Sequence, residues 1–355
     1  MKHKFKKTVS LFLILITVSC NNEKTNIKSN FKSEKNIQHA VIELTNNAFL
    51  ANVFKLELTG DDLIVYDYNT KTFFSIINIK DNSLYAHFGN LGQGPNELLM
   101  MPNALTVLND SIMTLFNSNQ NTLFYINYKG DMLPKKKLEF NKNDNIRSVI
   151  SISSQRYIAL GAFEEGRYLL LDENGEKLSF NFDYPSMTDG TELSTPMFKH
   201  MAFQGTLMRK PNGDSFFFVT SKSEIFEIIK VNEDDKLDKV FSYHGETGQF
   251  VFEGDGYSRT SIATKRASKM FFADATCSDN YIYLLYSNKV IGDNIYSAYR
   301  SNNVLVFDWK GEPVTSLLLD IEVDNIAVDR NDSYMYAYNK STEQLVKFDL
   351  PQQEL

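Results

Sequence analysis

The chain has 355 residues, of which 23% are charged and 43% are hydrophobic, and it carries a formal net charge of −7 at pH 7. This length allows one large domain or two medium ones. Beyond its first nineteen residues this acidic chain has no basic run interleaved with aromatic residues. It is therefore a poor match to nucleic acid, whose phosphates attract clustered lysine and arginine. Two cysteines, Cys20 and Cys277, are too few for a disulfide framework.

The first nineteen residues have the pattern of an export signal. Four lysines precede an apolar run at residues 9–18, which is shorter than the roughly 20 residues that a membrane-spanning helix needs. The run ends in Thr17-Val18-Ser19-Cys20, which resembles the lipobox of bacterial lipoproteins. The resemblance implies a lipoprotein signal peptide over residues 1–19 and a lipid attached to Cys20. An ordinary secretory signal with a chance cysteine is the alternative.

A lipid on Cys20 would place the protein in the bacterial cell envelope. The outer membrane is the expected address, and its periplasmic or surface face stays open. Residues 20–36 are polar and hold too little apolar surface to form a core, so they are expected to be a flexible tether.

Residues 37–355 show repeated strand patterns and almost no helical period. The same signal, a polar turn followed by an aromatic or aliphatic strand, occurs six times at intervals of about 45 to 65 residues. The six turns lie at residues 60–62, 109–110, 154–155, 212–214, 279–280 and 331–332. Asparagine, aspartate and glycine suit such turns because they tolerate left-handed backbone conformations.

Six repeats of this length predict an all-β fold, a six-bladed β-propeller that forms a single domain. A many-stranded β-sandwich is the alternative, although a sandwich does not need the same turn six times. The last repeat supplies three strands before the chain ends. We therefore expect the N-terminal strand at residues 39–44 to complete the last blade and so to close the ring.

A glycine-rich segment after the first repeat carries a family resemblance. Gly92, Gly94, Pro95 and Glu97 keep a Gly-x-Gly-Pro-x-Glu frame, and Pro102 leads into the next strand. The segment resembles the motif of the Bacteroidetes six-bladed β-propeller lipoproteins, which are called TolB-like or NHL-like. It departs from that motif at two positions, where Asn96 replaces glycine and Leu98 replaces phenylalanine. The resemblance implies an architecture and no reaction.

Sequence signatures of catalysis are absent: the chain has no His-Glu-x-x-His, Cys-x-x-Cys, Gly-x-Ser-x-Gly or Gly-Lys-Ser/Thr segment. We therefore expect no catalytic residues, no cofactor and no metal. A calcium-dependent lactonase or lyase remains an alternative because propellers host such sites, and fold alone does not decide function. A structural component of an envelope assembly is a third possibility.

Long connections between strands indicate where a ligand would bind. The connections at residues 89–103, 184–204, 244–271 and 287–302 should rise on one face of a propeller, and residues 261–270 are expected to include a short helix. Side chains on these connections form a basic, tyrosine-rich rim on an acidic protein. The candidate ligand-binding residues are Arg259, Tyr257, Lys265, Arg266, Arg300 and His200.

Arg259 is the first choice in this set because a guanidinium offers paired donors to a carboxylate or sulfate. A solvated face that only covers the channel is the alternative. The sequence thus favours a monomeric, lipid-anchored binding module over an enzyme, with an envelope protein, a glycan or an anionic small molecule as partner.

Overall fold

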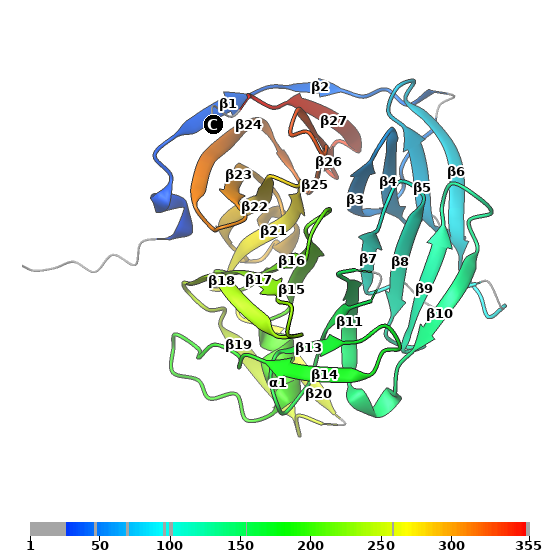
Figure 1. Cartoon of the computed structure of the whole chain (residues 1–355). Helices are drawn as coiled ribbons and strands as arrows, with labels where there is room; N and C mark the ends of the chain where they lie inside the picture. The colour runs from blue at the N-terminus through cyan, green and yellow to red at the C-terminus, as the bar shows by residue number, and fades with distance from the viewer. Residues whose placement is uncertain are drawn as a thin grey trace, which may run out of the picture.

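The chain folds into a ring of six antiparallel sheets around a central channel (Figure 1). The computed structural model describes residues 26–45, 48–68, 71–94, 97–98, 102–153, 155–257 and 259–352. Cys20 and Pro95 lie outside the described residues. The six-bladed β-propeller predicted from the repeated turns is confirmed.

Each blade contains four strands in the order a to d from the channel outwards. Blade 1 contains β3 (Val53–Thr59), β4 (Asp62–Asp67), β5 (Thr72–Asn78) and β6 (Ser83–Asn90), and blade 2 contains β7 (Ala104–Val107), β8 (Ile112–Asn117), β9 (Thr122–Asn127) and β10 (Pro134–Glu139). After the short helix η3 (Lys142–Asp144), blade 3 contains β11 (Ile146–Ser151), β12 (Tyr157–Gly161), β13 (Tyr168–Leu171) and β14 (Lys177–Asn181).

The second half of the ring repeats this order. Blade 4 contains β15 (Gly205–Arg209), β16 (Ser215–Thr220), β17 (Ile225–Val231) and β18 (Leu237–His244), and blade 5 contains β21 (Lys269–Cys277), β22 (Tyr281–Val290), β23 (Ser301–Asp308) and β24 (Pro313–Val323). Blade 6 contains β25 (Asn325–Val328), β26 (Tyr334–Asn339), β27 (Gln344–Asp349) and the N-terminal β2 (His39–Val41).

The six predicted turns join strands a and b of the six blades, and side-chain hydrogen bonds explain why they form. The Asn109 side-chain oxygen accepts the backbone N–H of Ser111 at 3.0 Å. The corresponding Asp329 carboxylate accepts the N–H groups of Ser333 and Tyr334 at 2.6 and 2.9 Å. Each polar side chain thus replaces a backbone partner at the turn.

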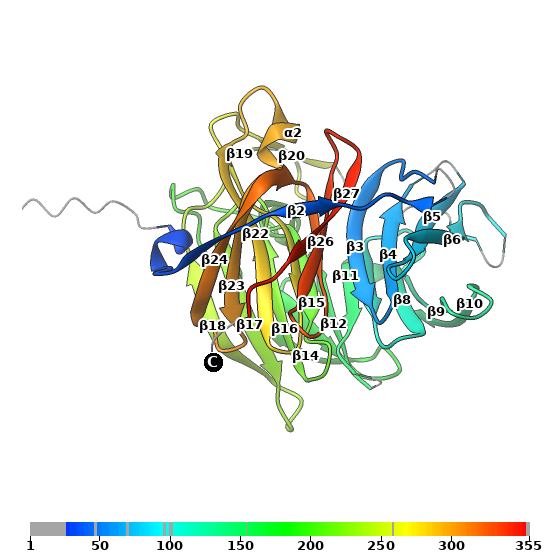
Figure 2. The ribbon, with the colours of Figure 1, turned by 90° about the horizontal axis from the view of Figure 1, so that it is seen from above.

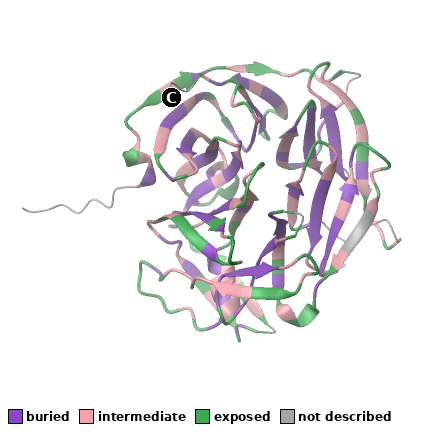
Figure 3. Cartoon of the chain, in the orientation of Figure 1, coloured by how far each residue is buried: buried purple, intermediate pink, exposed green. Residues whose placement is uncertain are grey.

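Apolar side chains of neighbouring blades pack together and form the core. Between blades 4 and 5, for example, Phe226 and Phe307 have ring centroids 5.0 Å apart. Figure 3 shows the result, with buried residues along the strands and exposed residues mainly in the connections. The phenylalanine and tyrosine residues at alternating strand positions are therefore mostly packing residues.

The glycine-rich segment after blade 1 is a structural motif. A Glu97 carboxylate oxygen accepts the backbone N–H of Gly94 at 2.7 Å, and a Cβ on Gly92 would lie 1.9 Å from the same oxygen. Leu98 is fully buried in the core between blades 1 and 2. The carbonyl of Pro102 accepts the Tyr66 hydroxyl at 3.1 Å, so the segment ties the first blade to the second.

The ring closes through the N-terminal strand, as predicted. β2 pairs antiparallel with β27, and His39 lies opposite Phe348. The His39 ring also contacts both carboxylate oxygens of Asp320 at 3.1 Å. Strands from the two ends of the sequence therefore share blade 6, and the outer edge of β27 is covered.

The expected flexible tether is wrong for residues 26–36, which pack against the ring. The helix η1 (Ile27–Asn30) buries Ile27 completely between blades 4 and 5. Strand β1 (Glu34–Ile37) then pairs in parallel with β24 of blade 5, and Figure 2 shows β1 and β2 crossing the outer edges of blades 5 and 6. The apolar contacts of Ile27, Phe31 and Ile37 and the backbone pairing of β1 hold this polar segment against the ring. None of the described helices is long and apolar enough to cross a bilayer.

Candidate functional site

Insertions on one face of the ring form a small additional layer. This insertion face carries the b-to-c and d-to-a connections. The loop from blade 3 to blade 4 contains α1 (Pro196–Ala202), and the loop from blade 4 to blade 5 contains the hairpin of β19 (Phe250–Gly254) and β20 (Thr260–Thr264). A further helix, α2 (Ile295–Ala298), lies in the b-to-c loop of blade 5, and it projects with the hairpin from the same side of the ring (Figure 2).

The two larger insertions pack on each other, and we call residues 184–203 with the hairpin the cap. Phe198 of α1 and Phe252 of β19 have ring centroids 5.0 Å apart. The Thr188 backbone N–H donates to the Thr247 hydroxyl at 2.8 Å. Thr195 caps the start of α1 by accepting the N–H of Phe198 at 3.3 Å.

The short helix expected within residues 261–270 is wrong, because this stretch continues β20, turns and enters β21.

A cavity of about 350 Å³ lies beside α1, among the connections of blades 2, 3 and 4, and we call it the cap cavity. Its lining combines cationic, neutral polar and apolar side chains. The lining residues are Asn103, Ser118, Arg147, Ser148, Leu160, Arg167, Tyr184, His200, Phe203, Gln204, Gly205 and Phe218. A cavity of this size with a few polar groups on an apolar wall is typical of a small-ligand site.

Arg167 is the most unusual residue of the cap cavity because it is buried to 1% exposure. One nitrogen of its guanidinium pairs with the fully buried carboxylate of Glu227. Its Nε and Nη1 groups have no hydrogen-bond partner among the described residues. The guanidinium carbon lies 4.7, 5.8 and 5.5 Å from the ring centroids of Tyr168, Tyr184 and Phe218. The aromatic rings thus hold a cation whose donors are only partly used.

The Glu227 carboxylate is already saturated by its other neighbours. The Tyr168 hydroxyl donates to Oε2 at 2.6 Å, Lys239 Nζ lies 3.1 Å from Oε1, and the His244 ring lies 2.9 Å from the same atom. Two permanent cations, Arg167 and Lys239, therefore share one carboxylate. The wall of the cavity keeps an excess of positive charge within an acidic protein.

Arg147 and His200 link the cap cavity to the surface. Both line a second hollow of about 310 Å³, together with Tyr257 and Gln204. Burial and the nearby Arg147 together lower the pKa of His200 to about 4, and burial is the larger cause. His200 is therefore neutral at physiological pH and offers one N–H donor and one acceptor.

The position of Arg147 follows from an irregularity in blade 3. Ile146 pairs with Gly161, but Ser148 pairs with Leu160, so Arg147 is the additional residue of a β-bulge. A bulge redirects a side chain that would otherwise follow the regular alternation of the strand. Arg147 is exposed and lines both hollows.

The structure brings together only two of the six predicted ligand-binding residues, His200 and Tyr257. Arg259 is exposed at the end of the hairpin, where its backbone closes the turn with Asp255, and it lines neither hollow. Arg266 pairs with Asp293 on the surface, and Arg300 donates to the Ser341 hydroxyl of blade 6. Lys265 is exposed beyond the other end of β20 and near Asp189, whose pKa it helps to lower.

Sequence reasoning missed Arg147, Arg167 and Gln204. Arg167 stands directly before the apolar run of β13, where a buried arginine is rare without a partner. An arginine at this position, next to a buried strand, was the signal in the sequence that could have identified Arg167. Arg147 carried no signal, because a β-bulge is not visible in a single sequence.

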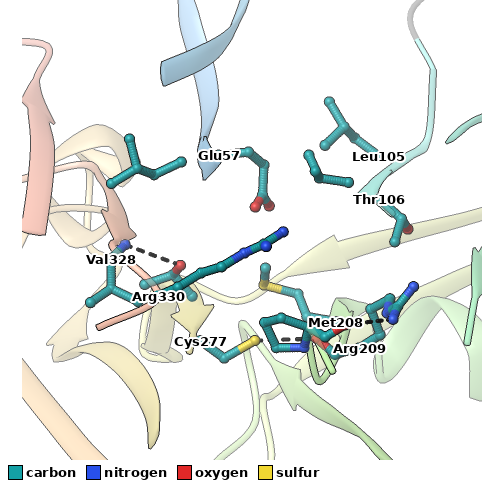
Figure 4. Close-up of a pocket in the computed structure, with 12 residues that line it drawn as sticks. Glu57, Leu105, Thr106, Met208, Arg209, Cys277, Val328 and Arg330 are labelled. Carbon is teal, nitrogen blue, oxygen red and sulfur yellow. Dashed lines mark hydrogen bonds between the residues drawn. The ribbon is translucent and has the colours of Figure 1, made fainter. Parts of the chain in front are cut away.

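The central channel holds a different arrangement of charges. A pocket of about 50 Å³ is lined by Glu57, Arg209, Cys277 and Arg330, among others, and Figure 4 shows the side chains of Glu57 and Arg330 pointing toward one another. Lys55 pairs with Asp274 at 2.7 Å nearby. This space suits a few water molecules rather than an organic ligand. Among the described residues, no group of three or more His, Cys, Asp and Glu side chains is placed to hold a metal ion.

Two solved structures are similar to the chain, and the first of them supports the same fold. A putative exported protein from Bacteroides fragilis NCTC 9343 has a TM-score of 0.51 and 9% identity, and the match covers 92% of this chain and 97% of that chain. A member of the DUF4221 family from Bacteroides vulgatus ATCC 8482 has a TM-score of 0.49 and 11% identity, with 88% and 97% covered.

No curated protein sequence matches the chain. The sequence model of the family described as TolB-like 6-blade propeller-like matches residues 30–331. That range begins in the segment that crosses the outer edges of blades 5 and 6 and ends at the last a-to-b turn. The chain therefore belongs to the TolB-like six-bladed propeller family.

Proposed function

We propose that this protein is a lipid-anchored binding module of the bacterial cell envelope, and that it takes its ligand in the cap cavity. The observation that carries the binding site is the cavity itself. The insertion that carries α1 packs against the hairpin, and its residues Tyr184, His200 and Phe203 line the cavity. The lining of this space of about 350 Å³ mixes cationic, hydroxyl, amide and aromatic groups.

The envelope address is supported by the N-terminal pattern and by a neighbour. Residues 1–19 have the pattern of a signal peptide that ends before Cys20. The Bacteroides fragilis structure with the same architecture is described as a putative exported protein. A Cys20→Ala variant should move from the membrane fraction to the soluble fraction of the envelope. If it stays with the membrane, the anchor is wrong.

The binding site is tested by filling the cavity. Ser118 is half-buried in a turn of blade 2 at the cavity wall, so a Ser118→Trp substitution should occupy the cavity without disturbing the core. Gln155→Trp places the same large side chain on an exposed turn of the opposite face.

The wild type and both variants would be screened for binding against envelope glycans, small acids and envelope extracts. Loss of a bound component in Ser118→Trp and its retention in Gln155→Trp supports the cap cavity. The reverse pattern places the ligand on the opposite face and contradicts the proposal.

A further inference from the structure

We infer that the cap cavity recognises a carboxylate on a hydroxylated small molecule, which Arg147 and Arg167 contact together. This inference rests on the proposed function and adds the chemical class of the ligand. Three observations carry it: the unused donors of a buried arginine, the excess of positive charge around it, and the types of the remaining lining residues.

The first observation is the state of Arg167. A buried charged donor without a partner is rare, because its lost contacts with water are not replaced. Here Nε and Nη1 of a side chain that is 1% exposed have no hydrogen-bond partner among the described residues. These two donors have almost no accessible surface, so a ligand oxyanion reaches them only when the neighbouring side chains shift, and it then supplies the missing acceptors. A guanidinium binds a planar carboxylate through two parallel hydrogen bonds, which makes the carboxylate the matching group.

The second observation is the balance of charge. Glu227 is the carboxylate paired with Arg167, and Lys239, Tyr168 and His244 already occupy its oxygens. Among the described residues, no carboxylate lines the cap cavity, whereas Arg147 and Arg167 both do. Arg147 forms no ion pair with a described residue. An anion in the cavity would therefore meet two cations and no repelling carboxylate on the lining.

The third observation concerns the rest of the molecule that carries the carboxylate. Ser118, Ser148, Asn103 and Gln204 present hydroxyl and amide groups that both donate and accept hydrogen bonds. Leu160, Phe203 and Phe218 form the apolar part of the lining. Hydroxyl groups on the ligand would match the first set and its C–H surface the second. A simple inorganic anion would leave most of this lining unused.

The probes are D-galacturonate and its trimer, which carry carboxylates beside hydroxyl groups. Matched controls are the methyl ester, which removes the charge and keeps the shape, and inorganic sulfate and phosphate, which keep the charge and lose the shape. Binding would be measured by titration calorimetry at constant salt. The uronates should bind at least tenfold more tightly than the ester and than either inorganic anion.

The variants separate the cavity from general surface charge. Arg147→Gln should weaken uronate binding at least tenfold, because it removes an exposed cation that needs no partner for folding. Arg266→Gln removes one charge from the same face but outside the cavity, and it should change the affinity less than twofold. Arg167→Lys keeps the charge beside Glu227 but loses the paired donors. It should weaken binding in a protein whose melting temperature shows that it is folded.

A spectroscopic measurement gives an independent readout. His200 lines the cavity beside Arg147, so a bound carboxylate should raise its pKa, which NMR titration of the imidazole can follow. Equal binding of the acid and the ester, or tighter binding of sulfate or phosphate, would overturn the inference. So would a folded Arg147→Gln protein with wild-type affinity, or an unchanged His200 titration.

The two proposals fail in different ways. If an envelope component binds the wild type and Ser118→Trp abolishes this, but no uronate binds, the cap cavity stands as the site and the carboxylate is wrong. If the uronates bind equally to the wild type and to Ser118→Trp, the cap cavity itself is wrong as the site.

Discussion

Burial sets the protonation of two side chains that face the hollow parts of the ring. Burial raises the pKa of Glu57 to about 7, with Asp274 acting in the same direction and Lys55 against it. Burial lowers the pKa of His200 to about 4, and Arg147 adds to this effect. The two residues therefore have opposite effects on how stability depends on pH.

The Glu57→Gln substitution should stabilise the protein at high pH only. The folded state binds the Glu57 proton more tightly than the unfolded state does, so the contribution of Glu57 to stability is fully present below its ordinary pKa of 4.5 and is lost as pH rises through 7. Glutamine cannot ionise. The free energy of unfolding of the variant should exceed that of the wild type by on the order of 2 kcal/mol at pH 8, and by almost nothing at pH 4.

Urea unfolding at several pH values measures this difference. Glu233→Gln, at an exposed position, should show no such trend. A difference between Glu57→Gln and the wild type that does not vary with pH would show that the pKa of Glu57 is the same in the folded and unfolded states.

The Arg147→Gln substitution should raise the pKa of His200 only part of the way from about 4 to the ordinary value of 6.5, because burial is the larger cause. A folded-state pKa below the ordinary value means that the stability contribution of neutral His200 is present above pH 6.5 and is lost as pH falls through 4. The loss should therefore be smaller in the variant and complete at a higher pH, because the folded-state pKa lies closer to the unfolded-state value. NMR titration of the imidazole measures the shift, and Arg266→Gln serves as the control. A pKa that does not move would show that Arg147 points away from His200.

At the scale of elements, the N-terminal segment at residues 26–31 packs against blades 4 and 5 and links them. Ile27 lies in the core between blades 4 and 5, and its backbone N–H donates to the buried Glu224 carboxylate at 3.0 Å. The Tyr286 and Tyr243 hydroxyls donate to the same carboxylate at 2.5 and 3.2 Å. The ring of Phe31 lies 5.0 Å from that of Phe307. The segment is thus part of the folded domain, and a lipid on Cys20, six residues before Asn26, would hold the ring within about 20 Å of the bilayer surface.

The Ile27→Ala substitution should lower the free energy of unfolding by about 2–4 kcal/mol, because it leaves a cavity in a fully buried site. Lys32→Ala lies in the same segment at an exposed position and should change stability by less than about 0.5 kcal/mol. Denaturant unfolding of both variants makes the comparison. Equal, small effects would mean that residues 26–31 are not held against the ring in solution.

At the scale of the whole molecule, the ring depends on its N-terminal strands to cover sheet edges. β1 covers β24 of blade 5, and β2 covers β27 of blade 6. The connection between them is a single residue, Gln38. One short segment therefore protects two neighbouring edges that would otherwise present unpaired backbone groups to another chain.

Deletion of residues 26–44 should cause association of the chains, because it exposes the edges of β24 and β27 together. Size-exclusion chromatography with light scattering, on protein purified without the export signal, would detect dimers or larger species. Deletion of residues 21–25 removes a stretch outside the described residues and should leave the wild-type elution unchanged. A monomeric, stable protein after the larger deletion would show that the ring closes without its N-terminal strands.

The sequence by itself determined the six blades and the order of their strands. These features depend on local chemistry, since five of the six a-to-b turns use their own asparagine, aspartate or glycine and the turn of blade 3 uses serine. Each strand also shows its own apolar pattern. Ring closure could be predicted too, because the last repeat lacked one strand and residues 39–44 could supply it.

The site and the packing of the N-terminal segment against blades 4 and 5 were decided only by the tertiary structure. Arg147, Arg167 and His200 come from a β-bulge, a b-to-c loop and an insertion helix, and no spacing in the sequence relates them. Ile27 is a single apolar residue in a polar stretch, and its burial depends on a groove that two distant blades form. Contacts between residues far apart in the chain follow from how the blades pack, which local patterns do not encode.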